Sequence, residues 1–155
     1  MNRSPILRAL SSMRRSGVRM LLMGGQACVF YGAAEFSRDL ELLILASPEN
    51  LENLRTALID LKAESIAVTP FDAAWLVKGH TFHFRCHHDD VAGLRIDVMS
   101  RYRGAPEFEE LWNRRTVFEV GGEPVPLLVL EDLEERRRDR EYWEPLRHHK
   151  PANSP

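Results

Sequence analysis

The sequence predicts a single α/β (α+β) domain with a mixed central β-sheet flanked by helices. Two observations carry this prediction. Helical periodicity alternates with short apolar runs over the first half of the chain, and strand-like segments dominate the second half. The length of 155 residues suits one domain. We therefore expect one domain over residues 1–147 and a disordered polar tail over residues 148–155.

The first half of the chain is predicted to form a helix, a strand, a helix, a strand and a helix, in that order. Ser4 before Pro5 is typical of a helix start, and Gly17 is typical of a helix end. Residues 18–23 and 40–45 are apolar runs of the kind found in strands buried on both faces. Residues 26–34 have a helical pattern between them. Ser47-Pro48 opens a third helix, which carries leucines on one face through residue 61.

The second half reads mainly as hairpins. A polar turn at residues 87–90 separates two strand-like segments, and Gly121-Gly122 separates two more. The expected strands are residues 80–86, 94–99, 116–120 and 124–129. The expected helical segments are residues 70–77, 106–112 and 131–143.

Bulk properties exclude several classes of protein. The net charge of −2 excludes a globally basic nucleic-acid binder, so we expect no DNA partner. No apolar run approaches the ~18 residues of a membrane span. Cys28 and Cys86 lack zinc-site spacing and are typical of buried reduced thiols. These properties predict a cytoplasmic protein.

Gly24-Gly25 lies at a predicted strand-to-helix turn. Without side chains the backbone can approach a phosphate closely, and the N-terminus of the following helix presents N–H groups. The alternative is a tight turn that needs glycine only for packing. The pair alone does not decide between the two.

Two carboxylates, Asp39 and Glu41, stand in an otherwise apolar strand with Leu40 between them. Strand alternation places both carboxylates on one face. Two neighbouring carboxylates on a largely buried strand repel each other and are costly to desolvate, unless a cation such as Mg²⁺ lies between them. The alternative is a solvent-facing edge strand with two harmless charges.

A third strand carboxylate is Asp97, which alone would be read as an ion pair with Arg95 or Arg85. Together with a glycine turn and two earlier carboxylates, it suits phosphoryl chemistry assisted by divalent metal ions. A carboxylate beside such a metal site can also act as the base for an attacking hydroxyl.

This set of motifs resembles the signature of the DNA polymerase beta-like nucleotidyltransferase superfamily. The matching features are Gly24-Gly25, a spacer of about thirteen residues, the acid-hydrophobic-acid motif at Asp39-Leu40-Glu41, and a third acid at Asp97. The closer resemblance is to small bacterial nucleotidyltransferase-like proteins related to the toxin halves of abortive-infection toxin–antitoxin pairs.

The resemblance implies a nucleotidyltransferase fold and transfer of a nucleoside monophosphate from a nucleoside triphosphate to a hydroxyl of a protein or RNA. It implies Mg²⁺ or Mn²⁺ bound by Asp39, Glu41 and Asp97. It also implies a triphosphate held at Gly24 and Gly25 with Ser37 nearby, and a cognate antitoxin-like partner.

A catalytically inactive nucleotide-binding or protein-interaction module of the same fold is the competing interpretation. Three departures from the relatives favour it: Glu41 where they usually have Asp, Glu35 where they often have Arg, and an altered stretch over residues 134–143. A phosphohydrolase is less favoured, because no histidine pair suited to activating water is evident.

Four further residues are candidate nucleotide contacts. His80 is expected beside the carboxylates as a phosphate or acceptor contact, and zinc binding by the histidines is disfavoured. Arg85 and Arg95 lie on the same predicted hairpin as Asp97, where they could contact a triphosphate or pair with the acids. Arg38 could supply a cation, although strand alternation points it away from Asp39.

Overall fold

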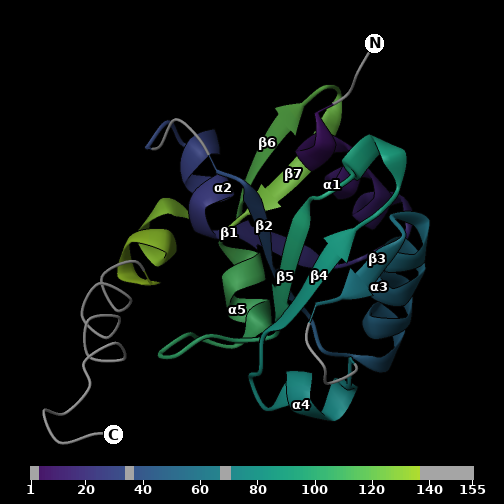
Figure 1. Ribbon diagram of the computed structural model, residues 1–155. Helices are drawn as coiled ribbons and strands as arrows, with labels where there is room; N and C mark the ends of the chain where they lie inside the picture. The colour runs from purple at the N-terminus through teal and green to yellow at the C-terminus, as the bar shows by residue number, and fades with distance from the viewer. Residues whose placement is uncertain (1–3, 34–36, 67–70, 137–155) are drawn as a thin grey trace, which may run out of the picture.

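The computed structural model describes residues 4–33, 37–66 and 71–136. Within these residues the chain folds into a seven-stranded mixed sheet flanked by helices (Figure 1). The helices are α1 (Pro5–Arg15), α2 (Gly24–Phe30), α3 (Pro48–Asp60), α4 (Ala73–Val77) and α5 (Phe108–Asn113), with a 3₁₀ turn η1 (Asp89–Val91) and a helix over residues 130–136. The strands are β1 (Met20–Met23), β2 (Asp39–Ile44), β3 (Ala63–Ser65), β4 (Phe82–Cys86), β5 (Arg95–Met99), β6 (Thr116–Val120) and β7 (Glu123–Leu127). The predicted fold class is confirmed.

The strands lie in the order β3-β4-β5-β2-β1-β7-β6. The β2–β5 and β1–β7 pairs are parallel, and the other pairs are antiparallel. Both expected hairpins are present as β4–β5 and β6–β7. The sheet therefore places β2 and β5 side by side at its centre, although α3, β3, α4 and β4 separate them in sequence.

The local signals in the sequence explain most of the elements. Gly17 follows α1 with a φ of 77°, a left-handed conformation that glycine adopts easily and that ends a helix. The hydroxyl of Ser47 accepts a hydrogen bond from the backbone N–H of Asn50 at 3.2 Å and so caps α3. Ser4 occupies the N-cap position of α1 without a capping side-chain hydrogen bond.

The core lies between the sheet and the helices on either side of it. Figure 1 shows α1 and α3 together on one side of the sheet and α2 on the other. Leu40 and Leu42 of β2 are fully buried, as are Ile96 and Val98 of β5. Because side chains alternate along a strand, burial of these residues on one face leaves Asp39, Glu41 and Asp97 together on the other face.

Three elements differ from expectation. Helix α2 begins at Gly24, two residues earlier than predicted, and ends at Phe30, short of the predicted residue 34. The sequence analysis did not identify β3, a three-residue strand that pairs with β4 at the edge of the sheet. The final helix is described over residues 130–136. The rest of its predicted span, the predicted tail at 148–155, and Glu35 lie outside the described residues.

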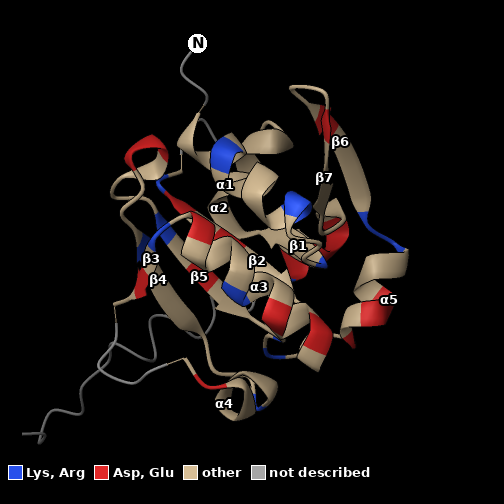
Figure 2. Cartoon of the chain, turned by 90° about the vertical axis from the view of Figure 1, so that its right-hand side faces the viewer, with Lys and Arg blue, Asp and Glu red and all other residues tan. Residues whose placement is uncertain are grey.

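The bulk expectations can also be compared with the structure. In the described part of the chain, no helix combines the length and the apolar character needed to cross a membrane. Cys28 and Cys86 are free thiols, but only Cys86 is buried as expected, and Cys28 is half-buried. Burial raises the pKa of Cys86 to about 11. Acidic and basic segments are interspersed over the face seen in Figure 2.

Candidate active site

Three strands bring six polar side chains onto one face of the sheet. The register aligns Glu41 of β2 with Asp97 of β5, and Asp97 with His83 of β4. Two residues earlier on β2, the register aligns Asp39 with Arg95 of β5, and Arg95 is aligned in turn with Arg85 of β4. Paired strands lie ~4.8 Å apart, so the two rows form one continuous polar patch. We call these six residues the polar patch.

The three predicted carboxylates differ in burial. Asp39 is exposed at the start of β2, Glu41 is half-buried, and Asp97 is buried with 7% of its surface accessible. The two acids that are adjacent in the register, Glu41 and Asp97, are therefore the more shielded pair. Asp39 faces solvent, where a ligand can reach it.

Asp97 is held by an arginine and a histidine. Arg95 donates from Nε to Asp97 Oδ1 at 3.0 Å, and His83 Nδ1 lies 2.6 Å from the same oxygen. The hydrogen bond to Asp97 is the largest cause that raises the pKa of Arg95 above its ordinary value. Within the described residues both contacts use Oδ1, so Oδ2 remains the oxygen through which Asp97 can meet a ligand. The ion-pair interpretation of Asp97 is thus realised with Arg95.

The protonation of His83 determines which of its contacts is a hydrogen bond. Arg95 Nη2 lies 3.0 Å from His83 Nδ1 and can donate to it only when that nitrogen carries no proton. Asp97 Oδ1 can accept from Nδ1 only when the nitrogen is protonated. The Nδ1-protonated ring therefore binds Asp97, and the other tautomer binds Arg95. The sequence analysis did not assign His83 to the site, and its two-residue spacing from Arg85 on one strand was the available signal.

The glycine turn packs against the same patch. Gly24 has a φ of 68°, and a Cβ at this position would overlap the carboxylate of Glu41. A Cβ on Gly25 would lie 2.9 Å from Ser37 Oγ, and this hydroxyl donates to the Asp39 carbonyl at 3.3 Å. The absence of both side chains allows the start of α2 to approach the acids of β2 closely. The structure thus brings Gly24, Gly25 and Ser37 together with Glu41.

The remaining candidate residues lie in different places. Arg85 sits beside Arg95 in the register and donates to the Gly93 carbonyl at 3.2 Å. Arg38 is exposed immediately before β2. His80 is exposed before β4, and its ring packs edge-on against Trp75 with the centroids 4.7 Å apart. His83 therefore stands next to Asp97, where the sequence analysis expected His80.

The donor chemistry of the patch fits a hard divalent cation. Carboxylate oxygens are the ligands that Mg²⁺ prefers, and the turn at Gly24 leaves space for the Glu41 carboxylate. The side-chain positions differ from a closed metal site. Among the described residues, no three His, Cys, Asp or Glu side chains are grouped closely enough to hold a metal ion. Asp97 directs Oδ1 toward Arg95 and His83.

Solved structures with the same arrangement of strands and helices exist. A Thermotoga maritima protein, provisionally described as a nucleotidyltransferase, superposes with a TM-score of 0.63 at 14% identity, covering 95% of this chain and 91% of that one. ANT(2")-Ia, in complex with adenylyl-2"-tobramycin, superposes with a TM-score of 0.52 at 15% identity, covering 97% of this chain and 79% of that one. The chain therefore has the nucleotidyltransferase fold.

Sequence comparison gives no closer relative. No protein-family model matches the sequence, and neither does any curated protein sequence. At these identities the structural likeness establishes the fold, and the activity has to be argued from the residues of the site.

Proposed function

We propose that the protein is a Mg²⁺-dependent nucleotidyltransferase that moves a nucleoside monophosphate from a nucleoside triphosphate to a hydroxyl of a protein or RNA. The observation that carries the proposal is the register of β2 and β5. It puts Glu41 beside Asp97, on the same face as Asp39, next to a glycine turn that packs on Glu41. Fold and donor chemistry support the same activity.

Each residue has a stated role in the proposal. Asp39 and Glu41 would hold Mg²⁺ or Mn²⁺, and Asp97 would complete the site through Oδ2. The backbone of Gly24 and Gly25 would accommodate the triphosphate, with Ser37 and Arg38 beside it. When bound, the metal neutralises phosphate charge and lowers the pKa of the attacking hydroxyl.

In the proposed reaction one phosphorus–oxygen bond forms as another breaks, and a side chain of this protein takes up the released proton. The acceptor oxygen forms a bond to the α-phosphorus, and the bond to the departing pyrophosphate breaks. Asp97 Oδ2 takes up the proton of the attacking hydroxyl. Arg95 and Arg85, which are aligned on neighbouring strands, would offset negative charge on the phosphates.

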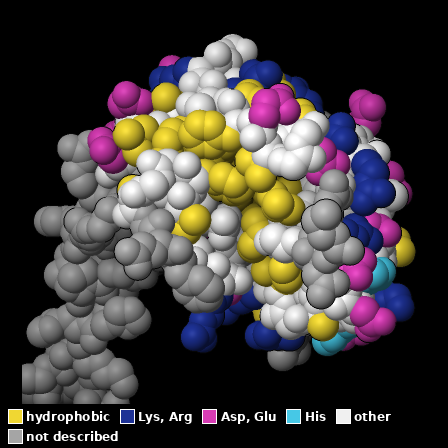
Figure 3. Space-filling model, turned by 90° about the horizontal axis from the view of Figure 1, so that it is seen from above, with side chains coloured by type: hydrophobic (Ala, Val, Ile, Leu, Met, Phe, Trp, Pro, Cys, Tyr) yellow, Lys and Arg dark blue, Asp and Glu magenta, His cyan; other side chains and the backbone are white. Residues whose placement is uncertain are grey.

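Three observations favour the alternative, a catalytically inactive nucleotide-binding or protein-interaction module. Asp97 is engaged by Arg95, and the acids of the described chain are not grouped as a closed metal site. Figure 3 also shows a band of hydrophobic side chains across one face, bordered by charged groups, as interaction surfaces often have. A cognate antitoxin-like protein, which the sequence resemblance implies, is the partner to test first for either function.

A labelling experiment separates the two functions. The purified protein is incubated with each α-labelled nucleoside triphosphate, Mg²⁺ or Mn²⁺, and cell extract. Asp39→Asn is the test variant, because it keeps the shape of the side chain and removes the charge. Asp89→Asn is the matched control, because Asp89 is exposed on η1 and is not one of the six residues of the polar patch.

The enzyme predicts labelled protein or RNA with the native chain and with Asp89→Asn, and loss of label by about 10²-fold or more with Asp39→Asn. Nucleotide binding without transfer in every reaction would establish the inactive module. Absence of nucleotide binding under all conditions would rule out both nucleotide functions.

A further inference from the structure

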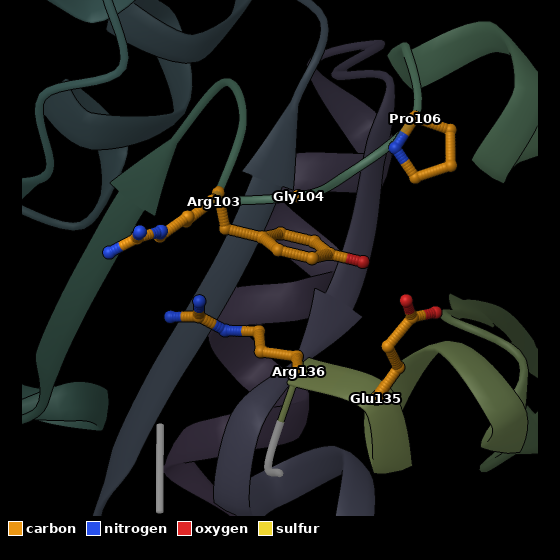
Figure 4. A pocket seen from close by; sticks show the side chains of 6 residues that line it. Arg103, Gly104, Pro106, Glu135 and Arg136 are labelled. Carbon is orange, nitrogen blue, oxygen red and sulfur yellow. The ribbon is translucent and has the colours of Figure 1, made fainter. Parts of the chain in front are cut away.

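A pocket of ≈ 260 Å³ opens between the loop that follows β5 and the helix over residues 130–136. Figure 4 shows the loop residues Arg103, Gly104 and Pro106 on one side, with Glu135 and Arg136 of the helix facing them. Tyr102 completes the lining. The volume is just below the ~300–1,000 Å³ of small-molecule sites, so the pocket suits a compact ligand group.

The pocket lies along the same sheet face as the acids. Met99 follows Asp97 by two positions on β5, so the two side chains share a face about 7 Å apart along the strand. Arg136 Nη2 lies 3.9 Å from Met99 Sδ. A ligand with its phosphate at Glu41 and Asp97 can therefore reach the pocket with a group one nucleoside away.

The lining suits a flat, neutral, polar group. The guanidinium carbon of Arg136 lies over the Tyr102 ring, 4.9 Å from its centroid, so the lining contains a planar aromatic group and a planar cation side by side. Burial raises the pKa of Tyr102 to about 12, so the phenol remains a neutral hydrogen-bond donor at physiological pH. Glu135 adds an acceptor, and Arg103 adds donors.

The mixture of charges argues against a phosphate as the occupant. Two arginines alone would favour an anion, but the carboxylate of Glu135 in the same lining repels one. A nucleobase presents both donors and acceptors on a planar edge and stacks on aromatic or guanidinium faces. A carboxylate accepts from exocyclic amino groups, such as N4 of cytosine.

We propose that this pocket binds the base of the nucleoside triphosphate and selects adenine, cytosine or guanine over uracil through Glu135. The proposal deepens the proposed function, because it names the part of the donor that the second half of the site recognises. The Tyr102–Arg136 pair stacks on the ring, and Glu135 accepts from the amino group. Uracil has no amino group, and its ring N3–H lies between two carbonyl oxygens that repel a carboxylate, so it is the poorest match for Glu135 among the four bases.

The test measures binding of free nucleosides without metal, so it does not depend on catalysis. Adenosine, cytidine, guanosine and uridine are titrated by NMR into the native chain to millimolar concentrations. Glu135→Gln tests selectivity, since the amide can donate as well as accept. Tyr102→Leu tests stacking. Asp89→Asn is the control, because Asp89 is exposed on η1 and does not line the pocket.

The expected result is that the three amino-bearing nucleosides bind at least about tenfold more tightly than uridine. Glu135→Gln brings the four nucleosides within about threefold of one another. Tyr102→Leu weakens all of them at least about fivefold, and Asp89→Asn changes none. Shifted resonances should fall in residues 102–106 and 130–136.

Uridine binding as tightly as adenosine would overturn the selectivity, and no nucleoside binding, or binding unaffected by Glu135→Gln, would overturn the pocket assignment. Glu135 is exposed, so its variant remains informative if Tyr102→Leu fails to fold. Nucleoside binding without labelling in the transfer assay would support the base pocket and reject the proposed enzyme activity. A failure of the pocket can therefore be distinguished from a failure of the proposed function.

Discussion

At the scale of single residues, the polar patch depends on side chains that are absent as much as on those present. Gly24 approaches the Glu41 carboxylate so closely that no other residue fits. Asp97 is buried, and Arg95 and His83 both contact its carboxylate. The sequence predicted the acids and the glycines, since alternation and turn signals are local. It did not predict the contact of His83 with Asp97, which depends on the register of β4 against β5.

Gly24→Ala should destabilise the protein and displace Glu41. The alanine would carry the strain of a positive φ, worth about 1–2 kcal/mol, and its Cβ would overlap the Glu41 carboxylate. The expected loss in free energy of unfolding is about 2–4 kcal/mol, measured by urea denaturation.

Gly32→Ala is the matched control for this substitution. Its φ is 78°, and no atom lies within 4 Å of its added Cβ. It should cost only the strain of about 1–2 kcal/mol. Equal destabilisation by the two variants would show that the contact with Glu41 has no energetic consequence.

Arg95→Gln should also destabilise the protein, because it removes the cation beside a buried carboxylate. The expected loss is about 1–3 kcal/mol in the free energy of unfolding. Arg85→Gln provides the comparison, since Arg85 is aligned with Arg95 and donates to a loop carbonyl. We expect it to change stability by less than about 1 kcal/mol. A reversed order would contradict the assigned role of Arg95.

At the scale of elements, hydrogen bonds to the carboxylate of Asp60 link α1 to α3. Asp60, the last residue of α3, accepts from Ser12 Oγ at 2.6 Å and from Arg8 Nη1 at 3.0 Å. The hydrogen bond from Ser12 is the main cause that lowers the pKa of Asp60 below its ordinary value of 3.8, and Arg8 adds to it. The two helices that cover one face of the sheet are thus joined by an interaction that requires the ionised acid.

The pH dependence of stability should show this contact. Because the folded pKa of Asp60 is lowered, its contribution is fully present above pH 3.8 and is lost as the pH falls through the folded pKa. Asp60→Asn should cost about 0.5–1 kcal/mol at pH 7, since the carboxylate is half exposed. The difference between the native chain and the variant should shrink below pH 3.8.

The measurement is urea denaturation at intervals between pH 7 and pH 3. A difference for Asp60→Asn that stays constant down to pH 3 would be inconsistent with the inferred link.

The helices and strands show which parts of the fold can be predicted from neighbouring residues alone. Turn residues and alternation predicted both hairpins, because a hairpin is determined by neighbouring residues. The β3 strand was missed because a three-residue edge strand has too few positions for a pattern, and its half-buried and exposed side chains give no apolar run. The early start of α2 was missed because glycine is a poor helix former, whereas here packing against Glu41 and Ser37 selects it.

At the scale of the whole molecule, the β6–β7 hairpin is joined to the central strands by a short backbone register and to α1 and the α2 region by side-chain contacts. In the described residues, β1 and β7 are aligned at one residue pair, Leu22 with Leu127. Leu128 N donates to the Leu22 carbonyl at 3.0 Å, and Tyr31 Oη donates to the Leu128 carbonyl at 2.8 Å. The β2–β5 pair, by contrast, is aligned from Asp39 through Leu43.

Native-state hydrogen exchange should therefore separate the two regions. We expect amides of β6 and β7 to exchange through partial opening, and amides of β2 and β5 only through global unfolding. Tyr31→Phe removes one attachment and should speed exchange in β7 by about fivefold, which corresponds to about 1 kcal/mol. The amides of β5 serve as the internal reference, and an equal acceleration there would refute the independent opening of the hairpin.

Strand order is the part of the fold that the sequence could not supply. The pattern of Asp39-Leu40-Glu41 predicts a face, but it does not say which strand lies beside it. Parallel pairing with β5 depends on the packing of α3, β3, α4 and β4, which lie between the two strands in sequence. Candidate residues for the site could be proposed from the sequence, and their arrangement in rows required the three-dimensional structure.

The parallel alignment of Glu41 with Asp97 also has a consequence for how the protein folds. Local hairpins such as β4–β5 close short loops and can form early, whereas the β2–β5 pair closes a long loop at a higher entropic cost. The two acids therefore come together late on the folding pathway. A chain still emerging from the ribosome would have Glu41 without Asp97, so the complete set of acids would exist only after β5 has been synthesised and has docked.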